Sequence, residues 1–486
     1  MDFKTLIAPF CPWMDPDARD RWQSNIPSFR RPVFGQLVED LRSLPQILSI
    51  TGPRRVGKST LLQQIVQNLL DSEKVPAERL VYYSLDDPAR LRMPSGGEDV
   101  LDQLMGHLHH LGQTGPVYLF LDEIHKLERW ELYLKKYYDL NYPVRIVISG
   151  SASSPIFKKS RESLLGRVKD YHVLPFSFRE FLLFRLSTRS DTAPLVEEIN
   201  RTGDIGDQIK GRVCGEPTYD GIAAVEIRCL PDVLWREAGL ALEDYLIDGG
   251  FPEVWSLPTQ EKKLDYLYDN QIKKVIYEDL VLAAEFRKPE QLKAFYISLL
   301  EQPGREVSQK SLAQEAGVNT QQVDKYLPLL EMTDLLAHAS KFRSSAVRVR
   351  RGNMKFYLVD LALRNAVLRI GKGLLSDSRM LGLYAENLVF NALRRWKGVL
   401  QIDYYRAGGG REVDFIVHTR PSCYLPVEVK YQETISPQDQ VGVDHFTARH
   451  KQKSQKPIMI TKNKEDFGPR GGCLLLPLVH FLLMMD

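Results

Sequence analysis

The stretch Gly52-Pro53-Arg54-Arg55-Val56-Gly57-Lys58-Ser59, followed by Thr60, decides how the N-terminal part of the chain folds. It fits the spacing G-x-x-x-x-G-K-[ST] at every position. An apolar run, Gln46–Ile50, precedes it, and a helical pattern through Leu70 follows. Glycines let the backbone wrap closely round a phosphate, and successive N–H groups at a helix N-terminus supply positive potential. The stretch therefore predicts a phosphate-binding loop between a strand and a helix.

Two side chains of this loop have expected roles toward ATP. Lys58 is expected to reach the β- and γ-phosphates, and the Ser59 hydroxyl to ligate Mg²⁺. The residues expected to bind the nucleotide from this loop are Gly52, Pro53, Arg54, Arg55, Val56, Gly57, Lys58, Ser59 and Thr60. The alternative is a chance glycine-rich turn, which the flanking strand and helix argue against.

A second apolar run, Val117–Glu123, ends in two acids. An acid at the carboxyl end of a strand lies beside the phosphate loop in a parallel sheet. We expect Asp122 to hold Mg²⁺ through water and Glu123 to orient and deprotonate the attacking water, which favours hydrolysis over nucleotide sensing. The alternative is a pair of solvated acids at a strand end.

Two further residues are candidates for the same site. Arg145–Ser151 is another strand that ends in hydroxyls, and Ser149 could contact the γ-phosphate, although such a serine is also an ordinary helix N-cap. An arginine supplied in cis or by a neighbour would neutralise charge in the transition state. We favour Arg167 over Arg161 for this role, and either could instead be a surface cation.

Size and charge limit the classes of protein. The chain has 486 residues, which corresponds to roughly three domains. It has 65 basic and 62 acidic residues, and 43% of its residues are hydrophobic, which excludes a disordered, collagen-like or membrane-embedded protein. Five cysteines without a CxxC pair fit a reducing cytosol, so a cytoplasmic location is expected. A net charge of +3 means that any nucleic acid would be bound by a local patch.

The middle of the chain predicts such a patch. Ser308–Leu327 has the pattern of a helix-turn-helix with a turn at Gly317, and Pro328 should kink the second helix or end it early. Six cations follow on a predicted strand pair, which would form a wing. The candidate DNA contacts are Gln321, Gln322, Lys325, Lys341, Arg343, Arg348, Arg350, Arg351 and Lys355. The alternative is a protein–protein spacer whose cations form a solvated edge.

The C-terminal part has acids and a lysine in the order of a restriction-endonuclease-like core. Glu386 lies on a helix, Asp414 on one strand, and Glu428 and Lys430 on the next, where period-two spacing puts both on one face. Glu386, Asp414 and Glu428 would ligate Mg²⁺ or Mn²⁺, and Lys430 would position or activate water. The alternatives are exposed acids on a strand face, or a nuclease fold that serves only as a binding platform.

The motifs resemble those of a prokaryotic group of AAA-type P-loop ATPases from about Arg30 onward. They are GPRRVGKSTLL (52–62), FLDEIHKLERW (120–130), VISGSAS (147–153), LLGRVKDYHVLPFSFREF (164–181) and DGGFPEV (248–254). The resemblance implies an AAA core, a helical and winged-helix middle, a C-terminal domain of unknown function with a nuclease-like fold, ATP hydrolysis and DNA transactions. A departure is the stretch 187–238, whose polar start, Ser187 to about Tyr219, predicts an inserted loop or small subdomain.

These patterns combine into one expectation of an α/β multidomain protein. The expected parts are an N-terminal arm at 1–28, an AAA-type P-loop ATPase core at 29–186, the insert at 187–238, a helical lid at 239–290, a winged-helix domain at 291–360 and a restriction-endonuclease-like domain at 361–486. We expect a homo-oligomer, a ring or a dimer, that couples ATP turnover to DNA remodelling or processing, without a membrane. Two alternatives remain, which are a DNA-junction or repair ATPase with an inactive nuclease-like domain and a nucleotide-driven switch that docks a protein partner.

Overall fold

The computed structural model describes residues 7–86, 98–151, 164–215, 221–222, 225–281, 289–301, 303–343 and 353–485. The chain forms two compact units. Unit 1 comprises Met1–Leu174, Tyr277–Arg287 and Met332–Asp334, and unit 2 comprises Pro175–Ile276, Lys288–Glu331 and Leu335–Asp486. Within the described ranges, no helix combines the length and the apolar character that crossing a membrane requires.

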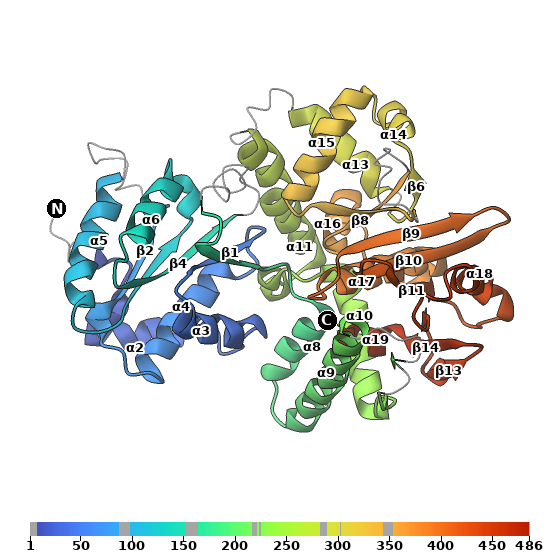
Figure 1. The fold of residues 1–486 in the computed structure, drawn as a ribbon, viewed down its shortest axis with the longest axis horizontal. Helices are drawn as coiled ribbons and strands as arrows, with labels where there is room; N and C mark the ends of the chain where they lie inside the picture. The colour runs from blue at the N-terminus through green and yellow to red at the C-terminus, as the bar shows by residue number, and fades with distance from the viewer. Residues whose placement is uncertain are drawn as a thin grey trace. The chain divides into compact units, whose positions relative to one another are not determined.

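Unit 1 is built on a five-stranded parallel sheet with the strand order β2-β3-β4-β1-β5 (Figure 1). The strands are β1 (Ile47–Gly52), β2 (Leu80–Ser84), β3 (Val117–Asp122), β4 (Val144–Ser151) and β5 (Val168–His172). The helices are α3 (Val33–Ser43), α4 (Lys58–Asp71), α5 (Glu98–Gly112) and α6 (Trp130–Asp139). Strands β1 and β3 are buried along their whole length, as in a parallel sheet covered on both faces. The predicted α/β class is confirmed.

The N-terminal residues that we expected to form an arm pack against this core. They form a short 3-10 helix, Pro12–Met14, and α2 (Pro16–Ser24). The indole N–H of Trp13 donates to the Leu80 carbonyl at 3.1 Å, and Trp13 is buried. Its burial ties the start of the chain to the first residue of β2.

In unit 2, a long helix occupies much of the stretch after Ser187, which we predicted to be an inserted loop or small subdomain. The helices here are α8 (Phe178–Ser187), α9 (Ala193–Cys214), α10 (Asp232–Asp248) and the C-terminal α19 (Leu478–Met485). Helices α9 and α19 pack so closely that a Cβ at Gly206 would lie 1.7 Å from the Met484 carbonyl oxygen. Of these two alternatives, the loop is wrong for 193–214, and the helix helps to bury the apolar C-terminus.

A nine-stranded mixed sheet forms the rest of unit 2, with the order β13-β14-β12-β11-β10-β9-β7-β8-β6. Its strands are β6 (Glu306–Val307), β7 (Leu336–Lys341), β8 (Met354–Leu358), β9 (Gln401–Ala407), β10 (Arg411–Arg420), β11 (Cys423–Lys430), β12 (Ile458–Thr461), β13 (Gly468–Arg470) and β14 (Cys473–Pro477). Strand β7 pairs in parallel with β9, through Ser340 opposite Asp403 and Lys341 opposite Tyr404. The sheet therefore combines strands from both sides of residue 361, where we expected a domain boundary.

Helices α14 and α15 form the helix-turn-helix pattern predicted from the sequence. The helices of this part are α11 (Gln260–Leu267), α13 (Pro289–Leu300), α14 (Gln309–Glu315), α15 (Thr320–Met332), α16 (Leu361–Leu368), α17 (Ser378–Arg394) and α18 (Val441–Arg449), with π-helical turns at Tyr268–Lys273 and Val275–Asp279. Gly317 has a φ of +64° in the turn, which favours glycine. Helix α15 contains Pro328 and continues to Met332, so the expected early end is wrong.

Candidate functional site

The phosphate loop lies between the end of β1 and the start of α4. Gly52 has a φ of +148°, and a Cβ there would lie 1.9 Å from the Val173 carbonyl oxygen, so the position requires glycine. Gly57, in the left-handed region at φ +93°, precedes the first residue of the helix, Lys58. The backbone therefore has the curvature that the glycine spacing predicted.

Lys58 is a buried cation inside this loop. Its Nζ donates to the carbonyl oxygens of Gly52 at 3.1 Å and Pro53 at 2.7 Å. Burial lowers the pKa of Lys58, although the charges of Glu123 and Asp122 act in the opposite direction. A buried ammonium is stabilised by an anion. The residues therefore fit the terminal phosphates of a nucleotide.

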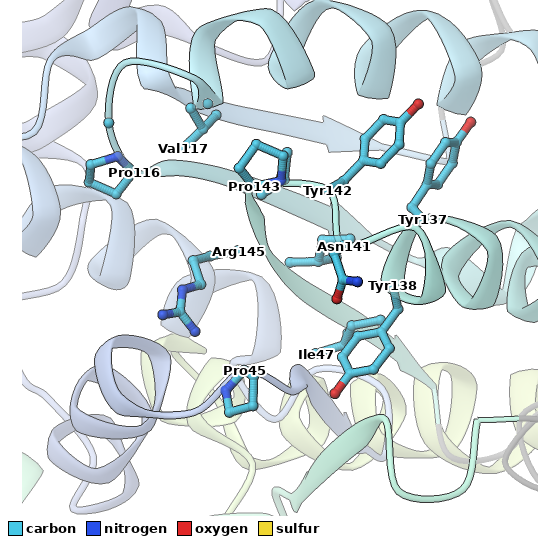
Figure 2. Close-up of a pocket in the computed structure, with 14 residues that line it drawn as sticks. Pro45, Ile47, Pro116, Val117, Tyr137, Tyr138, Asn141, Tyr142, Pro143 and Arg145 are labelled. Atoms are coloured by element: carbon cyan, nitrogen blue, oxygen red, sulfur yellow. The ribbon is translucent and has the colours of Figure 1, made fainter.

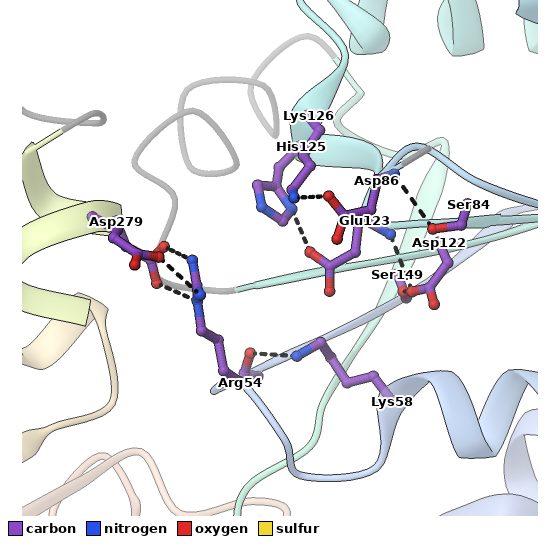
Figure 3. A network of polar contacts seen from close by, with 12 residues as sticks. Arg54, Lys58, Ser84, Asp86, Asp122, Glu123, His125, Lys126, Ser149 and Asp279 are labelled. Atoms are coloured by element: carbon purple, nitrogen blue, oxygen red, sulfur yellow. Dashed lines mark hydrogen bonds and ion pairs between the residues drawn. The ribbon is translucent and has the colours of Figure 1, made fainter. Parts of the chain in front are cut away.

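Asp122 is held by side chains from two neighbouring strands. It ends β3 and is 4% exposed. Its Oδ2 accepts the Tyr82 hydroxyl at 2.6 Å, and its Oδ1 accepts the Ser149 hydroxyl and the Glu123 N–H (Figure 3). Ser149 therefore anchors the Asp122 carboxylate. We predicted a phosphate contact for Ser149 and did not predict this one.

Tyr82 links the two residues that we expected to hold Mg²⁺. The Tyr82 hydroxyl donates to Asp122, and the Ser59 side chain interacts with Tyr82 and acts to lower the pKa of its hydroxyl. Burial and the Asp122 charge raise the pKa of Tyr82, so its hydroxyl stays protonated. A hydroxyl and a carboxylate joined through one bridging group fit the oxygen ligands that Mg²⁺ requires. No motif in the sequence marks Tyr82; its β2 position beside β3 became apparent only from the sheet order.

Glu123 follows Asp122 in a left-handed backbone conformation, with φ +53°. Burial raises the pKa of Glu123, which moves a carboxylate toward the basicity that a general base near neutral pH needs. The His125 Nδ1 lies 3.4 Å from the Glu123 Oε2. Burial lowers the pKa of His125 to about 4, so the ring is neutral at pH 7 and the contact is not an ion pair.

Arg54 of the loop is engaged by two acids from a distant stretch of unit 1. Its Nε donates to the Asp279 Oδ2 at 3.0 Å, and a second guanidinium nitrogen contacts the Asp279 Oδ1 (Figure 3). A third nitrogen lies 3.3 Å from the Glu278 Oε2. The Asp279 side chain is only 9% exposed. The predicted nucleotide contact by Arg54 therefore competes with a bidentate carboxylate pair.

A further series of polar side-chain contacts begins at Thr51, next to the phosphate loop. The Thr51 hydroxyl lies 3.1 Å from the His172 Nδ1, and the His172 Nε2 lies 3.0 Å from the Asp334 Oδ1. Asp334 belongs to the short piece Met332–Asp334 that joins unit 1, immediately after α15. Sequence reasoning missed this contact because 162 residues separate the histidine from the aspartate.

Arg167 lies at the opposite edge of the sheet from the phosphate loop of its own chain. Its carbonyl oxygen accepts the Ile47 N–H at 2.9 Å, where β1 begins, and β1 reaches the loop about 16 Å later. Its guanidinium Nε donates to the Asp139 Oδ1 at 2.7 Å. Arg167 therefore does not serve its own loop in this structure. Arg161 lies outside the described residues.

A pocket of about 480 Å³ opens at the same amino-terminal edge (Figure 2). Its lining includes Pro45, Ile47, Tyr138, Tyr142 and Arg145. Because these residues lie at the starts of β1 and β4 or precede them, the pocket is separated from the phosphate loop by the length of the strands.

Eight of the nine predicted DNA contacts fall into three groups. Gln321 and Lys325 are exposed on α15, and Arg343 is exposed after β7. Lys341 is half-buried, whereas the Gln322 amide donates to the Gln291 Oε1 at 2.9 Å and its carbonyl caps the helix. The residues outside the described ranges are Arg348, Arg350 and Arg351.

Lys355 requires a correction, because it is not an exposed cation of a wing. It lies on β8, is 4% exposed, and points into the C-terminal acids. Its Nζ is 2.9 Å from the Glu412 Oε1, 3.1 Å from the Glu386 Oε1 and 3.4 Å from the Asp414 Oδ1. Burial by itself lowers the pKa of Lys355, but the surrounding acidic groups outweigh it and hold the pKa well above the usual value.

The structure brings the three predicted metal ligands together. Glu386 comes from α17, Asp414 from β10 and Glu428 from β11, and they line a cleft of about 860 Å³ that also contains Lys430. Lys430 forms an ion pair with Glu428. Burial raises the pKa of both Glu386 and Glu428.

The arrangement of these acids does not fit a divalent metal, in contrast to our prediction. Among the residues that the structure describes, no group of three or more His, Cys, Asp or Glu side chains could hold a metal ion. The ammonium of Lys355 lies between Glu386 and Asp414. A cation is therefore already present where the metal was expected.

Comparisons with known proteins cover three stretches of the chain. A family model described as an AAA domain matches residues 44–182. Two models described as domains of unknown function, DUF8612 and DUF4143, match residues 239–373 and 381–481.

Whole-chain relatives are distant. An uncharacterized protein of Methanocaldococcus jannaschii is 23% identical over 436 residues, which is 88% of this chain and 85% of that protein. An uncharacterized protein of Haemophilus influenzae is 24% identical over 461 residues, which is 93% of this chain and 98% of that protein. The Walker-type ATPase of Pyrococcus abyssi is similar over 70% of this chain and 96% of that chain, with 14% identity and a TM-score of 0.39.

The phosphate loop, the parallel sheet and the family match together make residues 44–182 an AAA domain of the P-loop ATPase type.

Proposed function

We propose that this protein hydrolyses ATP with Mg²⁺ and couples that turnover to DNA. The observation that carries the ATPase part is the buried Lys58 ammonium inside a glycine-shaped loop, beside an anchored Asp122 and a Glu123 of raised pKa. Mg²⁺, when bound with the nucleotide, would neutralise charge on the phosphates.

Each residue of the site has a proposed task. Lys58 leaves its carbonyl acceptors and binds the β- and γ-phosphates, while Ser59 and Asp122 hold the metal. Glu123 accepts a proton from the attacking water. Ser149, from the neighbouring strand, fixes the orientation of Asp122.

The proposal for DNA rests on the segment from β6 to β8. Two helices joined by a tight turn, with the antiparallel strands β6, β8 and β7 beside them in sequence, have the order of a winged helix. Gln321 and Lys325 are exposed on the second helix, and Arg343 follows β7. Such side chains suit phosphate and base-edge contacts. The retained DNA candidates do not include Lys355.

We also propose that the active form is a homo-oligomer. Arg167 is partly exposed and lies at the sheet edge opposite its own loop. An arginine in that position acts in catalysis only on the nucleotide of a neighbouring copy. A dimer or a ring would supply this geometry.

ATP turnover measured with different DNA structures tests the proposal. Phosphate release is followed for the full chain without DNA and with single-stranded, duplex and four-way-junction DNA. We expect DNA to stimulate turnover and Lys58→Ala to abolish it. Lys325→Ala should weaken the DNA effect and leave the basal rate unchanged, and Lys262→Ala, an exposed lysine on α11, serves as the matched control. Indifference to every DNA would refute the DNA part, and turnover by Lys58→Ala would refute the assigned site.

A second candidate keeps the ATPase and assigns no cleavage to the C-terminal domain. The position of Lys355 among the acids favours this version over a metal-dependent nuclease. Docking of a protein partner by the C-terminal domain remains the proposal if DNA has no effect.

A further inference from the structure

We propose that the Lys355 ammonium is the resident cation of the C-terminal carboxylate cluster, in the position that a divalent metal would otherwise occupy. The inference concerns Lys355, Glu386, Glu412 and Asp414 only. It does not depend on ATP turnover or on DNA binding, so its failure would leave the function proposed above untouched.

The first argument is the geometry around the Lys355 ammonium. Its Nζ has carboxylate oxygens of Glu412, Glu386 and Asp414 at 2.9, 3.1 and 3.4 Å. The contacts with Glu386 and Asp414 are hydrogen bonds and the contact with Glu412 is an ion pair, so three carboxylates share one ammonium with three donors. The acids come from α17 and β10, whereas the lysine comes from β8.

The second argument is that Asp414 and Glu428 use carboxylate oxygens to hold the two strands together. The Asp414 Oδ2 accepts the Val429 N–H at 3.0 Å. The Glu428 Oε2 accepts the Asp414 N–H at 3.1 Å, and its other oxygen contacts Lys430. Each of these backbone bonds joins β10 to β11, so a metal would have to share these oxygens with backbone N–H groups.

The third argument concerns Glu386. Its Oε1 accepts the Tyr357 hydroxyl at 2.7 Å as well as the Lys355 ammonium. A Cβ at Gly304 would lie 3.3 Å from both Glu386 oxygens, so backbone covers this carboxylate from another side. A hydrated ion would therefore have to displace protein groups as well as the lysine.

Because the cluster is buried, removing its lysine has a free-energy cost unless another cation takes its place. Lys355 is 4% exposed and Asp414 is 8% exposed. Removing one member of a buried ion pair leaves its partner's charge uncompensated. Deleting the lysine should therefore convert the cluster into a site that attracts a divalent cation, and Mn²⁺ is a suitable probe because carboxylates bind it readily.

The test measures Mn²⁺ binding to the nucleotide-free full chain by electron paramagnetic resonance, which reports free Mn²⁺. Five proteins are compared, namely the native chain, Lys355→Arg, Lys355→Ala, Asp414→Asn and Lys355→Ala combined with Asp414→Asn. We expect Lys355→Ala to gain one Mn²⁺ per chain with an affinity at least tenfold higher than that of the native chain. The added Asp414→Asn should remove this gain, and Lys355→Arg should behave as the native chain does. Any Mn²⁺ held at the nucleotide site is common to all five.

Two results would overturn the inference. One is a native chain that binds a Mn²⁺ ion which Asp414→Asn alone abolishes. The other is a folded Lys355→Ala that gains no Mn²⁺. If Lys355→Ala is too unstable to titrate, the native chain and its Asp414→Asn variant decide the question, because equal Mn²⁺ binding by these two supports the resident lysine. Thermal unfolding with and without Mn²⁺ adds an independent measure, with a rise in Tm expected for Lys355→Ala alone.

Discussion

Replacing Tyr82 by phenylalanine removes one hydroxyl and leaves the ring in the sheet. That hydroxyl donates at 2.6 Å to Asp122, which is 4% exposed, and it interacts with the Ser59 side chain. A buried hydrogen bond to a charged group contributes about 1.5–3 kcal/mol. If that free energy is expressed in the transition state, where Asp122 and Ser59 share the metal, kcat/KM falls by roughly 10- to 100-fold. ATP binding should change little, because the loop backbone and Lys58 hold the phosphates.

Steady-state phosphate release as a function of ATP and Mg²⁺ measures this effect. The half-saturating Mg²⁺ concentration should rise, since the carboxylate and the hydroxyl are no longer held together. Tyr118→Phe is the matched control because Tyr118 is a buried tyrosine of the same sheet, at the amino end of β3. A Tyr82→Phe protein with native kcat/KM and native Mg²⁺ dependence would refute the view that Tyr82 positions the metal ligands.

Three further predictions concern other parts of the chain. Arg167→Ala should lower turnover without lowering ATP affinity, because the residue lies about 16 Å from its own loop. Unchanged phosphate release would exclude Arg167 as the arginine that neutralises charge in the transition state. Burial raises the pKa of Asp360 from 3.8 to about 6, so this group makes the free energy of unfolding fall as pH rises through that window, by about 3 kcal/mol in all. Asp360→Asn should flatten that slope in denaturant titrations at several pH values, and a slope identical to the native one would contradict it. Gly206→Ala should destabilise the protein by about 1–3 kcal/mol, because its Cβ would overlap Met484. The control Gly211→Ala, on the same helix with open space around its Cβ, should stabilise the protein by about 0.5–1 kcal/mol. Equal effects of the two substitutions would contradict the packing of α9 against α19.

The parts of the site that depend on local spacing could be predicted. The loop from Gly52 to Ser59 and the acids at the end of β3 are close in sequence to the strands that position them. Tyr82 could not be assigned, because its partner Asp122 is 40 residues away and the pairing follows from β2 lying beside β3. A strand order is a tertiary property, and a single sequence carries little signal for it.

Two predictions failed because distant packing outweighed local pattern. Lys355 follows a run of cations and alternates like an exposed strand residue, yet its charge partners lie 31 and 59 residues further on, at Glu386 and Asp414. In α9, Gly203 and Gly206 lower the helix propensity of the stretch. Gly206 is needed for close packing, since a Cβ there would lie 1.7 Å from the Met484 carbonyl oxygen. A weak helical pattern therefore reflected tight helix contacts and was not the sign of a loop.

The pairing of β7 with β9 has a consequence for anyone who divides this chain into pieces. The two family matches of unknown function meet between residues 373 and 381, which invites a cut there. Such a cut would leave β7 and β9 as open edges, each with unsatisfied N–H and C=O groups facing water. Open edges of this kind recruit strands from other molecules. The C-terminal fragment would also lack Lys355 and thus keep Glu386 and Asp414 without their counter-ion. Fragments separated at this boundary should aggregate or bind adventitious cations, so their behaviour would describe the cut ends and not the intact protein.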